Sequence, residues 1–190
     1  MTKEERFVVN PLQAFLLDPR RSGAAWGIKH RPKHGTSATG WDLQAERKNR
    51  VLLIEAKYIT GPFAAALAGL VTAPLMHRQE KMRSCKSKSW CAVVAWGIGW
   101  GRQRGSTRKY KMAGIYQIML DVLARNLEFW KCYSRVLKVK YIFFVDQGRV
   151  AKIRFDRVIT LAQRYAPVSG LSLSEKRYRA EKLLAFLVFK

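Results

Sequence analysis

Acidic residues are scarce in this chain. The 190 residues include 13 Asp and Glu against 36 Lys and Arg, which leaves a formal net charge of +23. Self-repulsion of this size opposes a compact fold and is relieved by a polyanion. The surplus therefore favours a nucleic acid as the partner, and a basic surface that only keeps the protein soluble is the alternative.

Cysteine is also rare, and its spacing excludes two kinds of structure. Cys85, Cys91 and Cys132 form an odd set without a C-x-x-C spacing, so the sequence predicts reduced thiols rather than a disulfide framework or a zinc site. His30 and His34 are separated by a proline that argues against a helix bringing them together. We therefore expect no metal site at the histidines.

The sequence has no long hydrophobic run of the kind that crosses a membrane. Residues 1–6 lack the apolar core of a signal peptide. The Ala- and Leu-rich stretch 61–76 is shorter than a membrane span and contains two prolines. We therefore expect a cytoplasmic, nucleoid-associated protein without a membrane partner.

Hydrophobic residues make up 48% of the chain, which excludes global disorder. Apolar spacing of helical period predicts helices over residues 3–17, 62–83, 115–137, 156–165 and 174–189. Alternating or continuous apolar runs predict strands over residues 24–29, 39–46, 50–58, 90–96, 139–145 and 149–155. This order predicts an α/β protein with a mixed central sheet and helices on its faces.

An apolar strand that suddenly carries charge is the most informative local feature. Residues 51–54 are all apolar and lead directly into Glu55, Ala56 and Lys57. On a strand, Glu55 and Lys57 point to one face, and Asp42 on the preceding antiparallel strand reaches the same end. Buried charge is costly unless it is paired or bound to metal. Two carboxylates and the backbone carbonyl of Ala56 suit Mg²⁺ or Mn²⁺, whereas a surface salt bridge on an edge hairpin is the alternative.

Asp42, Glu55 and Lys57 resemble the motif of the PD-(D/E)XK nuclease superfamily, although Trp41 stands where the family often has Pro. The resemblance covers residues 1–100 and implies a restriction-endonuclease-like core of order αβββαβ, with residues 101–190 as a helical and hairpin extension. It implies a Mg²⁺-dependent endonuclease that hydrolyses DNA phosphodiester bonds in DNA processing, recombination, restriction or a mobile element. Many members add an acid from the first helix, for which Glu5 is the candidate, with Glu4 and Asp18 as alternatives.

Basic residues on both sides of this motif are the predicted DNA contacts. They are Arg31, Lys33, Arg102, Arg104, Arg108, Lys109 and Lys111. The tryptophans, Trp26 among them, are either core residues or platforms on which bases stack. Cutting both strands of DNA requires two sites, so a homodimer is expected. A non-catalytic DNA- or RNA-binding protein is the alternative function, because it would account for the basic charge without requiring a catalytic site.

Overall fold

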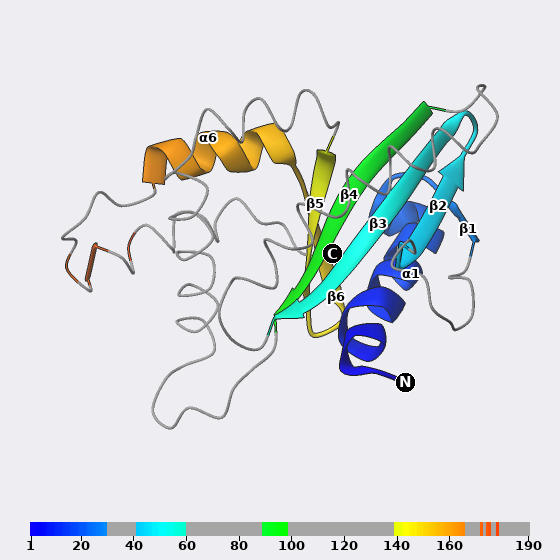
Figure 1. The fold of residues 1–190 in the computed structure, drawn as a ribbon, viewed down its shortest axis with the longest axis horizontal. Helices are drawn as coiled ribbons and strands as arrows, with labels where there is room; N and C mark the ends of the chain where they lie inside the picture. The colour runs from blue at the N-terminus through cyan, green and yellow to red at the C-terminus, as the bar shows by residue number, and fades with distance from the viewer. Residues whose placement is uncertain are drawn as a thin grey trace.

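The computed structural model describes residues 1–29, 41–59, 89–98 and 139–165, together with residues 172, 174, 175 and 178. In this part of the chain, six strands form one sheet in sequence order (Figure 1). Strand β4 is parallel to both β3 and β5, and the other neighbours are antiparallel. The predicted mixed α/β class is therefore confirmed. The strands are β1 (Gly27–Lys29), β2 (Leu43–Arg47), β3 (Arg50–Ile59), β4 (Ser89–Ile98), β5 (Val139–Asp146) and β6 (Arg149–Arg154).

The first helical region is continuous but irregular. A π-helical segment, η1 (Glu5–Val9), leads directly into α1 (Asn10–Leu17). The helix passes through Pro11 because this proline lies in the first turn of α1, where a missing N–H costs little. The short α2 (Pro19–Ser22) follows and ends at Gly23, whose φ of 81° suits glycine.

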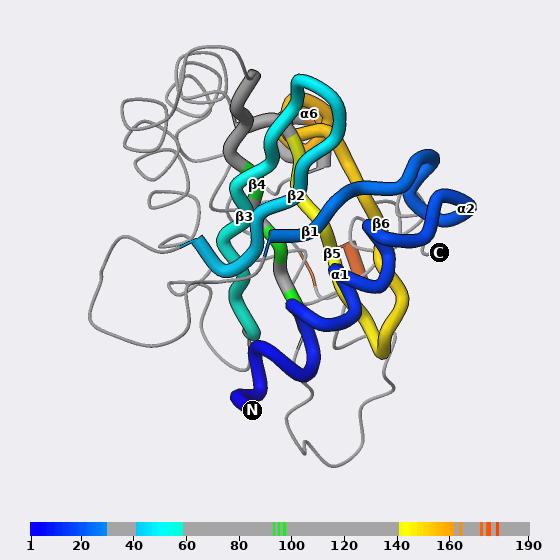
Figure 2. Tube along the Cα trace, turned by 90° about the vertical axis from the view of Figure 1, so that its right-hand side faces the viewer, coloured from blue at the N-terminus to red at the C-terminus, as the bar shows by residue number. Residues whose placement is uncertain are grey.

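One face of the sheet packs against η1 and α1 (Figure 2). The buried residues of this core cluster come from the helices and from every second position of the strands, and they include Val8, Leu12, Phe15, Leu16, Leu43, Ala45, Leu52, Ile54, Ala56, Phe143 and Val145. The intervening residues Val51 and Leu53 are also fully buried, on the other face, where they pack with Trp41. Because both faces of β3 are buried, β3 is a central strand, as its continuous apolar run predicted.

A close approach between helix and sheet brings the start of the chain to the end of β3. A Cβ atom added to Gly97 of β4 would overlap Cγ2 of Val8, so only glycine fits there without a shift. Nearby, the rings of Phe7 and Tyr58 stack with their centroids 5.3 Å apart. The first helical turns are therefore held against the carboxyl-terminal half of β3.

The second hairpin has the geometry that its sequence predicted. Strands β5 and β6 pair antiparallel around Gln147 and Gly148, which both have positive φ angles of 47° and 78°. Two positive φ angles match the twist of a two-residue hairpin turn.

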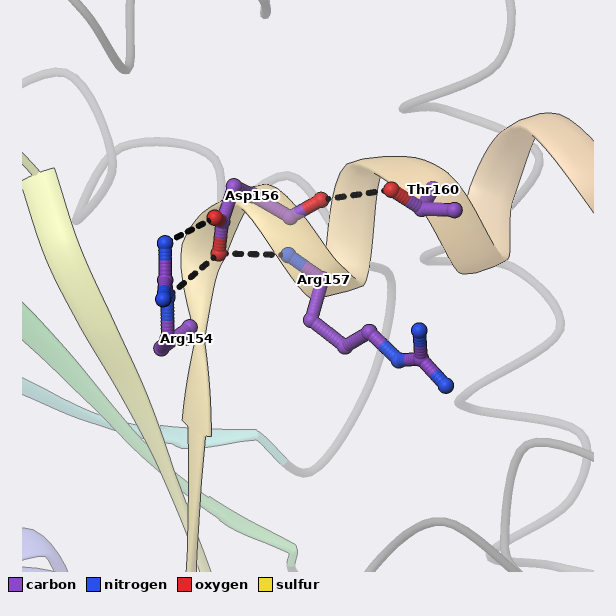
Figure 3. Close-up of polar contacts among 4 residues, drawn as sticks. All are labelled: Arg154, Asp156, Arg157 and Thr160. Carbon is purple, nitrogen blue, oxygen red and sulfur yellow. Dashed lines mark hydrogen bonds and ion pairs between the residues drawn. The ribbon is translucent and has the colours of Figure 1, made fainter.

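Helix α6 (Phe155–Tyr165) starts directly after β6, and its first turn is organised by Asp156 (Figure 3). Arg154 donates to both carboxylate oxygens of Asp156, and the backbone N–H of Arg157 donates to Oδ1 at 2.8 Å. The hydroxyl of Thr160 donates to the Asp156 carbonyl at 3.0 Å. A carboxylate in this first turn also complements the helix dipole. The helix packs on β5 and β6, away from α1 (Figure 1).

Three of the predicted helices fall outside the described residues, either wholly (62–83 and 115–137) or almost wholly (174–189). Strands from the two predicted parts of the chain, residues 1–100 and 101–190, are hydrogen-bonded neighbours, because β4 pairs with β5. The described helices include none that is long and apolar enough to cross a membrane.

Candidate active site

Asp42 lies immediately before β2 and is tied to β3 at two points. Its backbone N–H donates to the carbonyl of Ile54 at 2.9 Å, and its Oδ2 accepts from the N–H of Ala56 at 2.7 Å. Leu43 is paired with Ile54, so the next position along the ladder sets Asp42 beside Glu55. The hairpin register therefore brings these two carboxylates together at one end of the β2–β3 pair, and both side chains are buried.

Glu55 and Lys57 lie on the same face of β3, as their two-residue spacing predicted. Oε1 of Glu55 and Nζ of Lys57 are 2.5 Å apart. The Glu55 side chain is 9% exposed and the Lys57 side chain 26% exposed, so the carboxylate is buried while the amine keeps access to solvent. The alternative of a surface salt bridge does not describe this pair, because its acid lies inside the protein.

The third acid near this pair is Glu4. Its Oε2 accepts from the backbone N–H of Tyr58 at 3.3 Å, one residue beyond Lys57 on β3. Its negative charge also acts on the protonation of both Glu55 and Lys57. The group formed by Asp42, Glu55, Lys57 and Glu4 is called the carboxylate site below.

Glu5, the acid expected from the first helix, is used differently. Its Oε2 accepts from the backbone N–H of Thr2 at 2.6 Å, and its own N–H donates to Oγ1 of Thr2 at 3.1 Å. This reciprocal pair is a capping box, in which residue Thr2 caps the helix and the glutamate three positions later completes it. Glu4 is thus the acid that contacts β3, and a catalytic role for Glu5 stays a prediction. In the sequence, the pattern Thr2-x-x-Glu5 is typical of a capping box, and it was the signal that could have assigned Glu5 to the helix start.

Asp18, the remaining alternative, also has a local structural role. Its Oδ1 accepts from the backbone N–H of Arg20 at 2.9 Å and so caps the start of α2. The whole of η1 and α1 separates it from Glu4 along the chain.

Burial raises the pKa of Glu55 above its ordinary value, and the negative charges of Asp42 and Glu4 act in the same direction. The hydrogen bond and the positive charge of Lys57 act in the opposite direction but do not outweigh them. The anionic form of Glu55 is therefore less favourable in this site than in water. A further cation placed between the acids would stabilise it.

For Lys57, burial by itself lowers the pKa. The hydrogen bond to Glu55 and the negative charges of Glu55, Glu4 and Asp42 all raise it, and their sum exceeds the effect of burial. The net result is a pKa above the ordinary value. Lys57 is therefore a firmly protonated cation at neutral pH. It can stabilise negative charge or orient a water molecule, but it has no free electron pair with which to accept a proton.

The carboxylate site fits a small, hard divalent cation. Asp42 and Glu55 supply oxygen ligands, and Mg²⁺ is commonly held by one or two carboxylates while it keeps several waters. The two carboxylates lie side by side and are both buried, an arrangement that a cation between them would stabilise. Among the described residues, no group of three or more His, Cys, Asp and Glu side chains is arranged to hold a metal. A cation here would thus depend on Asp42 and Glu55, with the Ala56 carbonyl as the further predicted ligand.

The predicted DNA-contacting residues all lie outside the described part of the chain. They are Arg31, Lys33, Arg102, Arg104, Arg108, Lys109 and Lys111. Their position relative to the carboxylate site stays a prediction.

Comparison with known proteins gives no match. No protein-family model matches this sequence, and no curated protein or solved structure resembles it at a significant level. The resemblance to the PD-(D/E)XK superfamily therefore stays a prediction from the motif, and function is argued from the geometry of the carboxylate site.

Proposed function

We propose that the protein is a metal-dependent endonuclease that hydrolyses phosphodiester bonds in DNA, with a PD-(D/E)XK-type site. The observation that carries the proposal is the buried pairing of Asp42 and Glu55 beside the cation of Lys57. Acids are scarce in a chain of net charge +23, and a solvated acid would cost it nothing. Burying two of them side by side is costly, which favours a function that needs them there.

The strand order supports the same superfamily. A helix, an antiparallel meander of β1, β2 and β3, and then β4 parallel to β3 follow one another along the chain. This is the order expected for a restriction-endonuclease-like core, whose predicted helix between β3 and β4 falls outside the described residues. The carboxylate site lies on β3 and its hairpin partner, where the superfamily motif would place it. Strands β5 and β6 extend the sheet beyond β4.

Asp42 and Glu55 would hold the cation, and the Ala56 carbonyl would be the third ligand. Mg²⁺ or Mn²⁺ bound there supplies a water of lowered pKa and neutralises charge on the phosphate. The N–H of Ala56 donates to Oδ2 of Asp42 at 2.7 Å and so fixes the Asp42 carboxylate beside Glu55. Glu55 is held in place by its contact with Lys57, at 2.5 Å.

Lys57 would act on the scissile phosphate as a cation. Its raised pKa keeps it protonated, so it stabilises the negative charge that develops on the phosphoryl oxygens and orients the attacking water. Its partial exposure lets the amine reach a phosphate that approaches from solvent. Glu4 fixes the end of β3 through the Tyr58 N–H and adds negative charge that favours a cation in the site.

The charge surplus would supply the affinity for DNA. Lys and Arg that neutralise phosphates release counterions, so binding weakens steeply as salt rises. A homodimer would place two carboxylate sites on a duplex and allow both strands to be cut.

The test is a cleavage assay with supercoiled plasmid, linear duplex, single strands, a four-way junction and duplex RNA, each with Mg²⁺, Mn²⁺ or chelator. Asp42→Asn and Glu55→Gln remove one charge each without changing side-chain size. Glu46→Gln is the matched control, because Glu46 lies on β2 and pairs with Lys29 at 3.0 Å, away from the site.

We expect metal-dependent cleavage of DNA that Asp42→Asn and Glu55→Gln abolish and Glu46→Gln retains, with DNA binding preserved in all three. Equal cleavage by wild type and Asp42→Asn would overturn the proposal. Binding without cleavage of any substrate, with either metal, would instead identify a non-catalytic nucleic acid-binding protein. Preference for RNA over DNA of equal length would correct the substrate.

A further inference from the structure

A pocket lies at the turn between β2 and β3. It has a volume of ≈ 380 Å³ and is lined by Trp26, Arg47, Lys48, Asn49 and Arg50. Pockets that bind small molecules typically enclose about 300–1,000 Å³, so this one has the size for a ligand as large as a mononucleotide. Three of its five lining residues are cations, and one is a tryptophan.

The positive charges concentrated at this turn destabilise the β2–β3 hairpin. Arg47 and Arg50 are directly opposite each other in the ladder, where like charges destabilise a strand pair. Between them, Lys48 has a φ of 50°, in the left-handed region that a side chain rarely adopts. Within the described residues, no Asp or Glu forms an ion pair with any of the three. An anion in the pocket would remove this repulsion.

Trp26 gives the pocket an aromatic wall that is fixed in place. Its side chain packs against the core cluster, and its backbone N–H donates to the carbonyl of Leu16 at 3.1 Å. A tryptophan that is anchored on one side and lines a pocket on the other is a platform for a flat ring. Asn49 adds a side-chain amide, which can both donate to and accept from the edge of a base.

The pocket is separate from the carboxylate site. Arg50 is on the face of β3 that carries Leu52 and Ile54, whereas Glu55 is on the face of Val51 and Leu53. Five residues of strand also separate Arg50 from Glu55, which is about 16 Å at 3.3 Å per residue. One phosphate cannot reach both sites.

We propose that this pocket binds a phosphorylated nucleotide, with the phosphate at Arg47, Lys48 and Arg50 and the base stacked on Trp26. Guanidinium groups suit phosphate because they form paired, charge-assisted hydrogen bonds. The nucleotide is either free or part of a nucleic acid strand, since both present the same base and phosphate. The proposal does not depend on the nuclease function, because none of the lining residues belongs to the carboxylate site.

Calorimetric titration in chelator and low salt tests the pocket without cleavage. The ligands are AMP, adenosine, inorganic phosphate, and a short oligothymidylate with and without a 5′-phosphate. The variants are Arg47→Gln/Arg50→Gln and Trp26→Leu. Arg157→Gln/Arg164→Gln is the matched control, since it removes the same charge from exposed positions of α6. Circular dichroism checks that each variant is folded.

We expect Arg47→Gln/Arg50→Gln to weaken AMP or phosphorylated oligonucleotide binding at least about tenfold, and the control about twofold or less. Trp26→Leu should weaken AMP and adenosine alike, while leaving inorganic phosphate unchanged. Binding of AMP identifies a free nucleotide, and binding of the phosphorylated oligonucleotide alone identifies a nucleotide within a strand. The proposal is overturned if neither binds, or if the pocket variant and its control weaken binding equally. Asp42→Asn should keep AMP binding, so a failure of the nuclease proposal would leave this one intact.

Discussion

The neighbouring acids Glu4 and Glu5 offer a test in which one substitution should lower activity and the other should lower stability. Glu4→Gln keeps an oxygen that accepts from the Tyr58 N–H but removes the charge that acts on Glu55 and Lys57. Glu5→Ala removes the acceptor for the Thr2 N–H and opens the capping box. The first substitution changes the electrostatics of the carboxylate site, and the second changes the start of the helix.

The expected magnitudes differ accordingly. Loss of a helix cap costs about 0.5–2 kcal/mol, so Glu5→Ala should lower the free energy of unfolding by roughly 1 kcal/mol. In a chain of this size that corresponds to a fall in Tm of about 2–4 °C. Glu4→Gln should leave Tm nearly unchanged and reduce Mg²⁺-dependent cleavage about 10–100-fold, as substitutions of residues that support metal ligands commonly do. Without the charge of Glu4, the pKa of Glu55 should also fall towards its ordinary value.

Thermal unfolding and plasmid cleavage rates at a temperature well below Tm measure the two effects separately. The pH dependence of the rate adds a third readout, because Glu4→Gln should move the acidic limb to lower pH. The reasoning is refuted if Glu5→Ala loses cleavage while Glu4→Gln keeps it, since the carboxylate site would then be built from the other acid.

Further predictions concern the packing, the turn and the cation. Gly97→Ala should destabilise the fold by about 1–3 kcal/mol in urea unfolding, because the new methyl group overlaps Val8; an unchanged midpoint would contradict this contact. Arg50→Gln should stabilise the ligand-free protein by about 0.2–1 kcal/mol, because it removes the repulsion with Arg47. This gain should shrink in about 1 M salt. A loss of stability in this variant would contradict the predicted repulsion. The raised pKa of Glu55 means that its contribution to stability is present below pH 4.5 and is lost as pH rises through its folded pKa. Mg²⁺ should therefore raise Tm at neutral pH but not in acid, and not in Glu55→Gln; an equal rise in that variant would place the cation elsewhere.

The sequence predicted the core of the carboxylate site because its geometry is local. Asp42 and Glu55 belong to two strands joined by a tight turn, so the alternation of side chains and the turn position together set them side by side. The burial of Glu55 could be anticipated from the apolar run 51–54 before it. The second hairpin was predictable for the same reason, because Gln147 and Gly148 mark its turn.

The features that the sequence did not predict depend on contacts between distant segments. Glu4 reaches Tyr58 because the first helical turns lie against β3 and β4, an approach that Gly97 permits. The pairing of β4 with β5 joins strands about 40 residues apart, for which the sequence offers no local signal. The pocket at the β2–β3 turn likewise requires Trp26, which comes from a segment before β1.

The π-helical segment η1 sets the direction in which Glu4 points. Its backbone bond from Asn10 N–H to the Glu5 carbonyl spans five residues instead of the usual four, so this turn contains one residue more than an α-helical turn. Deleting a single residue between Glu5 and Asn10 would restore ordinary winding and leave the residues before it close to their present direction, because the wider turn absorbs the extra residue. Related chains that lack one residue within this turn would therefore still present the acid at the position of Glu4 to β3, although its number in the sequence would differ.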